Sequence, residues 1–161
     1  MRRNEKLKNL FFTSAINCLG ELIEEKIKLE KLSEQNYNFQ SKGLTVIVGI
    51  TEGGKGRMIL DMTQETALKL ANEITGETYT EIEDFVFITL SEIGNMIAGH
   101  GITKMNNEKK GLNLRLTPPS IFSGKELELN VPKVSLIGIN LNTEIGEISI
   151  HIGFEKLGED E

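Results

Sequence analysis

Glu92 and Asn95 are the two polar side chains whose types and spacing best suit chemistry on another molecule. Side chains three residues apart on a helix, where each residue advances by about 100°, project side by side. An apolar stripe falls on the opposite flank of the same predicted helix, at Ile82, Val86, Ile93 and Ile97. The pair is therefore predicted to point outward. The spacing alone also fits an ordinary solvated glutamate and asparagine, so it does not decide between these interpretations.

The surface around this pair is predicted to be a docking surface. Ile88 lies one turn before Glu92 on the same outward face, and an exposed apolar residue beside small ones favours an interaction site. Gly94, Ala98 and Gly99 are predicted to keep the neighbouring surface low. A glycine inside a helix costs about 1 kcal/mol relative to alanine, which is easier to understand if something approaches Gly94 closely.

Two other features suggest chemistry that the sequence does not support. Residues 49–55 fit the pattern GxxxxGK of a phosphate-binding loop, but Gly56 stands where a Ser or Thr must reach magnesium. A strand also follows where that motif needs a helix. His100 and His151 lie far apart, without a plausible serine or cysteine partner nearby in sequence. We expect His100 near the end of its helix and His151 on the solvent side of the last strand.

Three helices are predicted to support the candidate pair. The first spans residues 5–28, where apolar side chains recur every three to four residues. The second spans residues 64–75 and ends at Gly76, the residue type that commonly terminates helices. Thr80 and Glu83 have the spacing of a capping box, which predicts the start of the third helix and of the segment that carries the pair.

Strands are predicted near both ends of the chain. β-Branched and alternating apolar residues mark them at 44–50, 58–62, 112–116, 134–141 and 145–154. The first two are predicted to form one hairpin and the last two a second, which turns at residues 142–144. Tyr37 and Phe39 alternate as in a short strand, in a segment that reads as strand or loop. Strands at both ends with helices in the middle favour an α+β fold, a sandwich-like arrangement of an antiparallel sheet covered by helices.

Composition narrows the function classes. The 161 residues suit one domain, 1–161, and the 39% apolar content is compatible with a folded core. The net charge of −6 disfavours nucleic acid as a partner. No uninterrupted apolar stretch is long enough to predict a membrane span or a signal peptide, so we expect a cytoplasmic protein. Cys18 is the sole cysteine, and no Cys/His cluster has metal-ligand spacing, so we expect no metal site. Residues 158–161 are expected to form a frayed acidic tail.

The segment Ser91-Glu92-Ile93-Gly94-Asn95-Met96-Ile97-Ala98-Gly99 resembles the ExxN signature helix of the CheC/CheX/FliY chemotaxis phosphatases, specifically the CheX branch. The order of the surrounding segments is similar as well. These segments are the N-terminal helix with Ala15 and Asn17, the strand at 56–61, the helix at 65–71, and Gly76-Glu77 before the signature. The resemblance covers most of the chain and implies a long antiparallel sheet packed by helices.

The resemblance also implies a function in two-component signalling. A protein of this family is a hydrolase that dephosphorylates the response regulator CheY at its aspartyl phosphate. By similarity, Asn95 would orient the attacking water and Glu92 would pair with the receiver's active-site lysine. Ile88, Ser91 and Gly99 would contact the partner. Magnesium would belong to the receiver, so the chain would need no cofactor of its own.

This sequence departs from the family pattern, which limits the family features that can be expected of this chain. Two-site relatives repeat the ExxN pattern on the first helix, whereas here Ser14 stands three residues before Asn17, so one site is expected. The CheX-type arrangement implies a homodimer joined through sheet edges. The alternative function is a non-catalytic module that binds a response regulator or the flagellar switch, because the switch protein FliM shares the general fold. A phosphatase of a receiver other than CheY is a third option.

Overall fold

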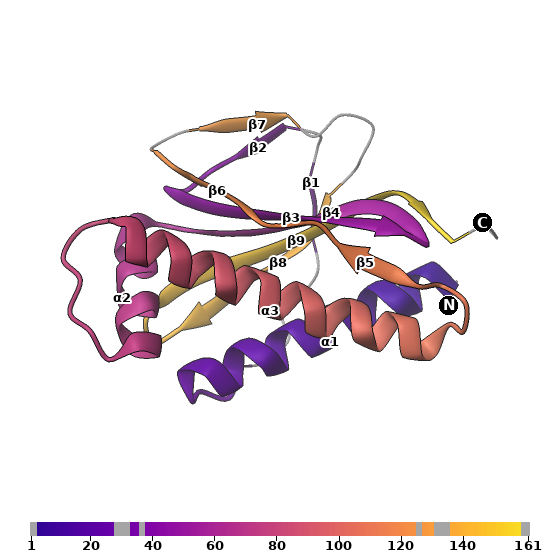
Figure 1. The fold of residues 1–161 in the computed structure, drawn as a ribbon, viewed down its shortest axis with the longest axis horizontal. Helices are drawn as coiled ribbons and strands as arrows, with labels where there is room; N and C mark the ends of the chain where they lie inside the picture. The colour runs from indigo at the N-terminus through magenta and orange to yellow at the C-terminus, as the bar shows by residue number, and fades with distance from the viewer. Residues whose placement is uncertain (1–2, 28–32, 36–37, 125–126, 131–135, 159–161) are drawn as a thin grey trace.

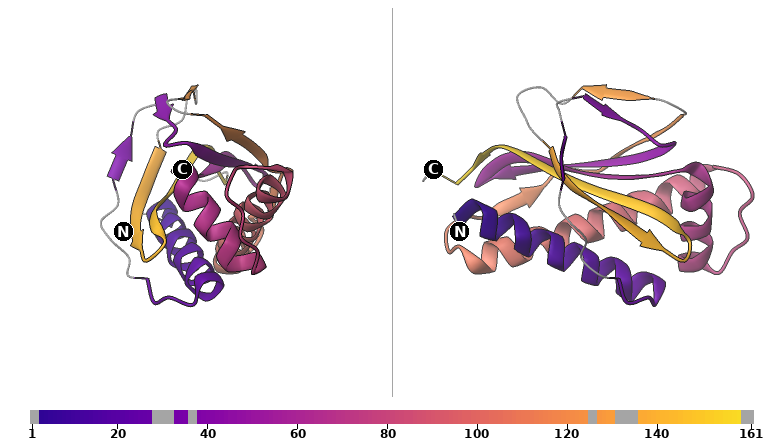
Figure 2. Two further views of the ribbon diagram at one scale, coloured as in Figure 1. Left: turned by 90° about the vertical axis from the view of Figure 1, so that its left-hand side faces the viewer. Right: turned by 180° about the vertical axis from the view of Figure 1, so that it is seen from behind.

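Within residues 3–27, 33–35, 38–124, 127–130 and 136–158, which this computed structural model describes, an antiparallel sheet of seven strands lies against three helices. The helices cover one face of this sheet, and a two-stranded sheet lies over the other face (Figure 1; Figure 2). The predicted α+β architecture, a long antiparallel sheet packed by helices, is confirmed. The predicted positions of Tyr37 and Val134 lie outside the described residues.

The helices are α1 (Arg3–Ile23), α2 (Gln64–Thr75) and α3 (Asp84–Glu108). The strands are β1 (Ser33–Gln35), β2 (Asn38–Gln40), β3 (Leu44–Glu52), β4 (Gly54–Met62), β5 (Leu114–Leu116), β6 (Ser120–Ser123), β7 (Glu128–Asn130), β8 (Leu136–Thr143) and β9 (Gly146–Leu157). In the large sheet the order is β1-β8-β9-β4-β3-β5, with β6 also paired to β3. Strands β2 and β7 form the small sheet.

Both predicted hairpins are present. Strands β3 and β4 pair from Leu44 opposite Met62 to Ile50 opposite Gly56, so the GxxxxGK segment is a hairpin and not a phosphate-binding loop. Strands β8 and β9 pair as far as Thr143 opposite Gly146, so the turn lies slightly later than the sequence predicts. The expected frayed tail is wrong at Gly158, whose N–H donates to the carbonyl of Gly53 at 2.8 Å.

The helix ends differ from the prediction in two places. Helix α1 ends at Ile23, earlier than expected, and α3 begins at Asp84, so the predicted capping box at Thr80 is wrong. The side-chain amide of Asn72 bonds both backbone groups of Tyr79, at 2.7 and 3.1 Å, and this holds the connection in a non-helical path. Helix α2 is as predicted: the Thr63 hydroxyl caps its start, and Gly76 ends it in the left-handed conformation.

Two glycines of α3 allow this helix to pack closely against strand β3 and helix α1. A Cβ on Gly94 would lie 2.7 Å from Val46 of β3, and one on Gly101 would lie 2.3 Å from the ring of Phe11 in α1. Gly94 and Ala98 are buried. The expectation that these residues lower the outer surface for a partner is therefore wrong, because the close approach is to the sheet. Helix α3 is long and apolar enough to cross a membrane by length and composition, but its buried residues belong to this core.

The second face of the large sheet carries His151, which the sequence analysis expected to meet water. His151 is only 2% exposed, so its predicted solvent-facing position is wrong. It alternates onto the face opposite the helices as expected, but the residues of the small sheet cover that face, and its ring packs edge-on against Phe39 of β2. Phe39, Ile59 and Leu136 form a small separate core there.

Candidate functional site

The outward face of α3 carries the candidate pair together with three exposed apolar side chains. Glu92 and Asn95 are both exposed. Phe85 is 64% exposed, Ile88 56% and Met96 42%, which makes this face the main concentration of exposed large apolar residues among the described residues. Large exposed apolar residues grouped with polar ones are typical of an interaction surface. We call these five residues the α3 face.

The polar side chains of the α3 face have no hydrogen bond or ion pair with the described part of the chain. Within the described part of the chain, neither the carboxylate of Glu92 nor the amide of Asn95 has a hydrogen bond or ion pair. An amide offers two N–H donors and an acceptor oxygen, and a carboxylate offers acceptors only. Both sets of groups are thus available to another molecule. Ser91 and Gly99, the other two predicted contact residues, are half-buried at the border of this face.

The buried side of α3 positions its outward face. Nine residues are buried against the sheet and α1: Val86, Leu90, Ile93, Gly94, Ile97, Ala98, Gly101, Ile102 and Met105. They recur every three to four residues, the spacing that places one side of a helix in a core. Because this side is packed, the backbone that carries Glu92 and Asn95 is held in a fixed place. The arrangement suits the positioning of bound groups more than covalent chemistry.

Phe85 and Met96 are residues of the α3 face that the sequence analysis missed. The sequence analysis gave them no position on the helix, although the two lie about 20° apart on a helical wheel, on the side of Glu92. The position of these two residues on the helical wheel was the signal that could have placed them on the outward face. Ile88, in contrast, was placed on the outward face from its spacing to Glu92, and it lies there.

Helix α1 contributes only a polar hollow next to this face. Asn17 is exposed, while Ser14 is 8% exposed and lines a hollow with residues of α3. The hollow has a volume of about 390 Å³ and is lined by Ser14, Gly99, His100, Thr103, Lys104 and Asn107. Ser14 supplies no carboxylate one turn before Asn17, so the Glu-and-Asn arrangement of α3 is not repeated on α1.

Of the three titratable groups with shifted pKa values among the described residues, Asp61 and His151 lie in the large sheet and Cys18, whose pKa is raised by burial, lies in α1. Burial raises the pKa of the Asp61 carboxyl, although hydrogen bonds from Thr45 and Lys42 oppose this shift. Burial and the nearby Lys42 ammonium lower the pKa of His151 to about 4. Among the described residues no three His, Cys, Asp or Glu side chains gather where they could hold a metal ion. The α3 face therefore offers hydrogen bonding and apolar contact.

The family model of the chemotaxis phosphatase CheX matches residues 44–141, which includes the strands of the first hairpin, α2, α3 and most of β8. This match assigns the antiparallel sheet packed by helices to the chemotaxis phosphatases of the CheC/CheX class. The chain belongs to the CheX family.

Individual relatives agree with this assignment. The chain is 27% identical over 145 residues to the CheY-P phosphatase CheX of Thermotoga maritima, covering 89% of both chains. A CheX crystal structure from Desulfovibrio desulfuricans has a TM-score of 0.81 at 20% identity and covers 92% of this chain and 99% of that one. The CheX–CheY–BeF₃–Mg²⁺ complex from Borrelia burgdorferi has a TM-score of 0.73 at 26% identity and covers 91% and 96%.

Proposed function

We propose that this protein is a phosphatase that accelerates hydrolysis of the aspartyl phosphate of CheY, or of a closely related receiver domain. The observation that carries the proposal is the exposed pair Glu92 and Asn95 on the outward face of α3, which has no hydrogen-bond or ion-pair partner among the described residues. Membership of the CheX family supports it, as do the Thermotoga relative named as a CheY-P phosphatase and the Borrelia complex of CheX with CheY.

Asn95 is the residue proposed to act on the reacting atoms. Its amide accepts a hydrogen bond from the attacking water and holds the water oxygen in line with the phosphorus. The water oxygen then bonds to phosphorus while the bond from phosphorus to the aspartyl oxygen breaks, which leaves a free carboxylate and inorganic phosphate. Phosphoryl transfer depends mainly on positioning and on charge stabilisation. One such hydrogen bond, worth roughly 1–3 kcal/mol, gives roughly a ten- to a hundredfold acceleration.

Glu92 is proposed to align the two proteins. Its carboxylate pairs with the lysine of the receiver's active site, which places Asn95 over the phosphoryl group. No covalent intermediate on this chain is required, since water attacks phosphorus directly. Magnesium belongs to the receiver in this proposal, and the Borrelia complex of CheX with CheY contains Mg²⁺ and BeF₃.

The apolar residues of the α3 face are proposed to supply binding energy. Phe85 and Ile88 precede the catalytic pair along the helix and Met96 follows it, so a docked receiver covers apolar surface on both sides of Asn95. Burial of such surface contributes about 25 cal/mol per Å². Ser91 and Gly99 border the contact. A half-buried glycine at 99 leaves room beside Asn95 for the partner's backbone.

Three further properties belong to the proposal. The chain acts as one CheX-like domain over 1–161, it resides in the cytoplasm, and it forms a homodimer through sheet edges. The described residues leave Ile139–Thr143 of β8 without a strand on the side away from β9, because β1 pairs only with residues 136–138. An edge of this kind can pair with a second chain. A sedimentation mass of one chain at micromolar concentration would contradict the homodimer.

The experiment that tests the function follows the decay of phosphorylated CheY with and without this protein. The wild-type chain is expected to shorten the lifetime at least tenfold, while the double variant Glu92→Gln/Asn95→Ala leaves the intrinsic rate unchanged. Persistent complex formation with no change in the decay rate would instead identify a non-catalytic binding module. If CheY is unaffected but another purified receiver loses phosphate faster, the chain is a phosphatase of that receiver.

A further inference from the structure

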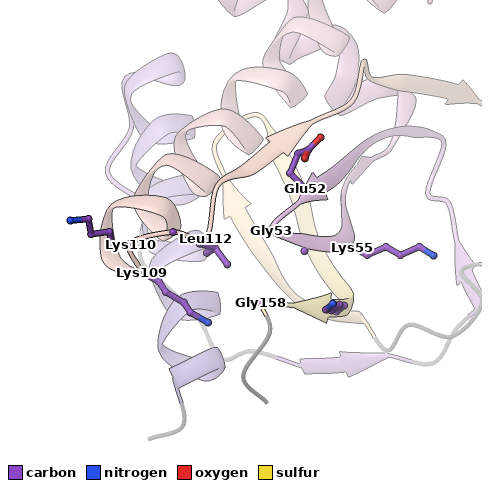
Figure 3. A pocket seen from close by; sticks show the side chains of 10 residues that line it. Glu52, Gly53, Lys55, Lys109, Lys110, Leu112 and Gly158 are labelled. Carbon is purple, nitrogen blue, oxygen red and sulfur yellow. The ribbon is translucent and has the colours of Figure 1, made fainter.

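A basin lined by lysines lies at the end of α3 that is remote from the catalytic pair (Figure 3). It forms where the β3–β4 turn, the α3–β5 connection and the end of β9 meet, and its volume is about 490 Å³. Its lining residues are Glu52, Gly53, Gly54, Lys55, Lys109, Lys110, Gly111, Leu112, Lys156 and Gly158. Lys109 comes fourteen residues after Asn95, which corresponds to about 21 Å along a helix. The basin is therefore separate from the α3 face.

The charge of the basin is opposite to that of the chain as a whole. Four lysines against one glutamate give the lining a formal charge of +3, in a chain with a net charge of −6. Glu155 offsets one of these charges by pairing with Lys55 at 3.3 Å. The carboxyl end of α3 adds an effective negative charge of only about one half. Among the described residues the balance of charge remains positive, so the basin favours an anion.

Lys109 is the lysine whose surroundings favour a ligand. Its Nζ atom is buried and has no hydrogen-bond partner among the described residues. Figure 3 shows the side chain turned toward Gly158, and a Cβ added at Gly158 would lie 2.5 Å from Nζ. A buried ammonium without a partner is costly, so a ligand oxygen within reach of Nζ would relieve that cost.

The backbone around the basin is shaped by tight turns. Glu52 and Asn113 have positive φ angles of 69° and 52°, values that are uncommon for residues other than glycine. A Cβ on Gly53 would lie 1.3 Å from the carbonyl oxygen of Leu112, so the two turns pack directly against each other. The hydrogen bond from Gly158 to Gly53 ties in the end of β9. Packing between the turns is enough to explain why glycines stand at these positions. The same packing holds the floor of the basin in place.

We propose that this basin binds a small phosphate-bearing anion, with Lys109 as the fixed contact. Lys55 and Lys110 extend outward on different sides in Figure 3, and these two with Lys156 form a flexible cationic rim. Leu112 is the one apolar side chain larger than alanine in the lining, and no aromatic ring is present there to stack on a nucleobase. Recognition thus depends on charge. The inference does not depend on the phosphatase reaction.

The test is a calorimetric titration of the full chain with tripolyphosphate and, separately, with inorganic phosphate, in 150 mM KCl. One site per chain is expected, with tripolyphosphate bound more tightly than phosphate. Lys109→Met is expected to weaken tripolyphosphate binding at least tenfold and Lys156→Met about threefold. The control Lys69→Met removes a lysine of α2 that pairs with Glu65 and should stay within twofold of wild type. No binding by wild type at millimolar ligand, or equal losses in the control, overturns the proposal.

Two further variants keep the result decisive. If Lys109→Met fails to fold, the exposed Lys156 and Lys110 carry the test, since Lys156→Met and Lys110→Met leave the buried side chains intact. The sequence also ends in three acidic residues after Gly158. If tripolyphosphate binds only when these are neutralised, in Glu159→Gln/Asp160→Asn/Glu161→Gln, the lysines serve the chain's own acidic residues and the proposal is overturned. Binding with these three residues unchanged supports it.

Discussion

The two faces of the large sheet handle polar groups in opposite ways. On the side of the helices, the α3 face presents Glu92 and Asn95 to solvent, and neither side chain has a hydrogen-bond or ion-pair partner within the ranges that the structure describes. On the side of the small sheet, Asp61 is fully buried and accepts hydrogen bonds from the Thr45 hydroxyl at 2.7 Å and the Lys42 amide at 3.1 Å. The Asp61 carboxylate is thus satisfied within the chain, whereas the pair on α3 is left for a partner.

This difference explains why shifted pKa values do not locate the proposed site. Perturbed titratable groups often mark catalytic centres, but buried structural networks perturb pKa values as well. Here burial shifts the pKa values of Asp61 and His151, and both lie on strands behind the small sheet. A phosphatase that positions water on another protein's active site requires exposed hydrogen-bonding groups instead. The proposed site is therefore marked by a polar pair that has no hydrogen bond or ion pair among the described residues.

The largest expected effect concerns the buried face. Because the pKa of His151 is lowered from 6.5 to about 4, the unfolded chain takes up this proton first as the pH falls. The stability that neutral His151 contributes is full above pH 6.5 and is lost as the pH falls toward 4, by about 3 kcal/mol. His151→Phe should remove this component. Urea unfolding of both proteins between pH 7.5 and 4 measures it, and parallel stability curves would contradict the assignment.

Asp61 should act in the opposite direction in the same experiment. Its raised pKa means that the folded chain binds this proton more readily, so its contribution to stability is greatest at low pH and falls as the pH rises through the raised pKa. This contribution is present in both proteins. The difference between the two curves therefore isolates His151.

A second prediction separates the inner and outer sides of α3. Gly101→Ala should destabilise the fold by about 1–3 kcal/mol, because the added Cβ would lie 2.3 Å from the Phe11 ring. Gly99→Ala is the matched control two residues earlier, where the nearest atom would be Leu116 at 3.8 Å. That change should be neutral or stabilising by up to about 1 kcal/mol. Thermal unfolding of the two variants compares them, and equal destabilisation would contradict the packing described for α3.

A third prediction concerns the apolar part of the α3 face. Phe85→Ala is expected to raise KM for phosphorylated CheY about tenfold, equivalent to about 1.4 kcal/mol of binding, while kcat and the melting temperature change little. Phe122→Ala is the control, since Phe122 of β6 is 40% exposed and pairs with Thr45 on the opposite side of the sheet. Initial rates over a range of CheY concentrations separate KM from kcat. An unchanged KM would remove Phe85 from the contact.

The sequence predicted the elements whose patterns are local. The Leu44–Met62 hairpin, α2 with its terminal Gly76, and the outward position of Ile88 follow from alternation, helix-ending chemistry and helical spacing. The errors arise where a distant segment decides. His151 alternates as predicted but is covered by the small sheet, and Gly94 packs against Val46, a residue far away in the sequence.

The candidate site, like the fold, was predictable where local spacing decides and not where distant segments meet. Side-by-side projection of Glu92 and Asn95 follows from their spacing, whereas their roles came from the resemblance of the surrounding nine residues to a known signature. Phe85 and Met96 could have been found from a helical wheel, because both fall on the side of Glu92. The lysine basin joins three segments that are distant in sequence, so no local pattern predicts it.

The most direct test of the account compares binding and hydrolysis in one variant, Asn95→Ala. The exposed amide supports no internal contact among the described residues, so the fold and the affinity for BeF₃-activated CheY should match wild type within about threefold. Stimulated phosphate release should fall by about a hundredfold. Hydrolysis at the wild-type rate by a variant that binds normally would contradict the proposal that Asn95 positions the attacking water.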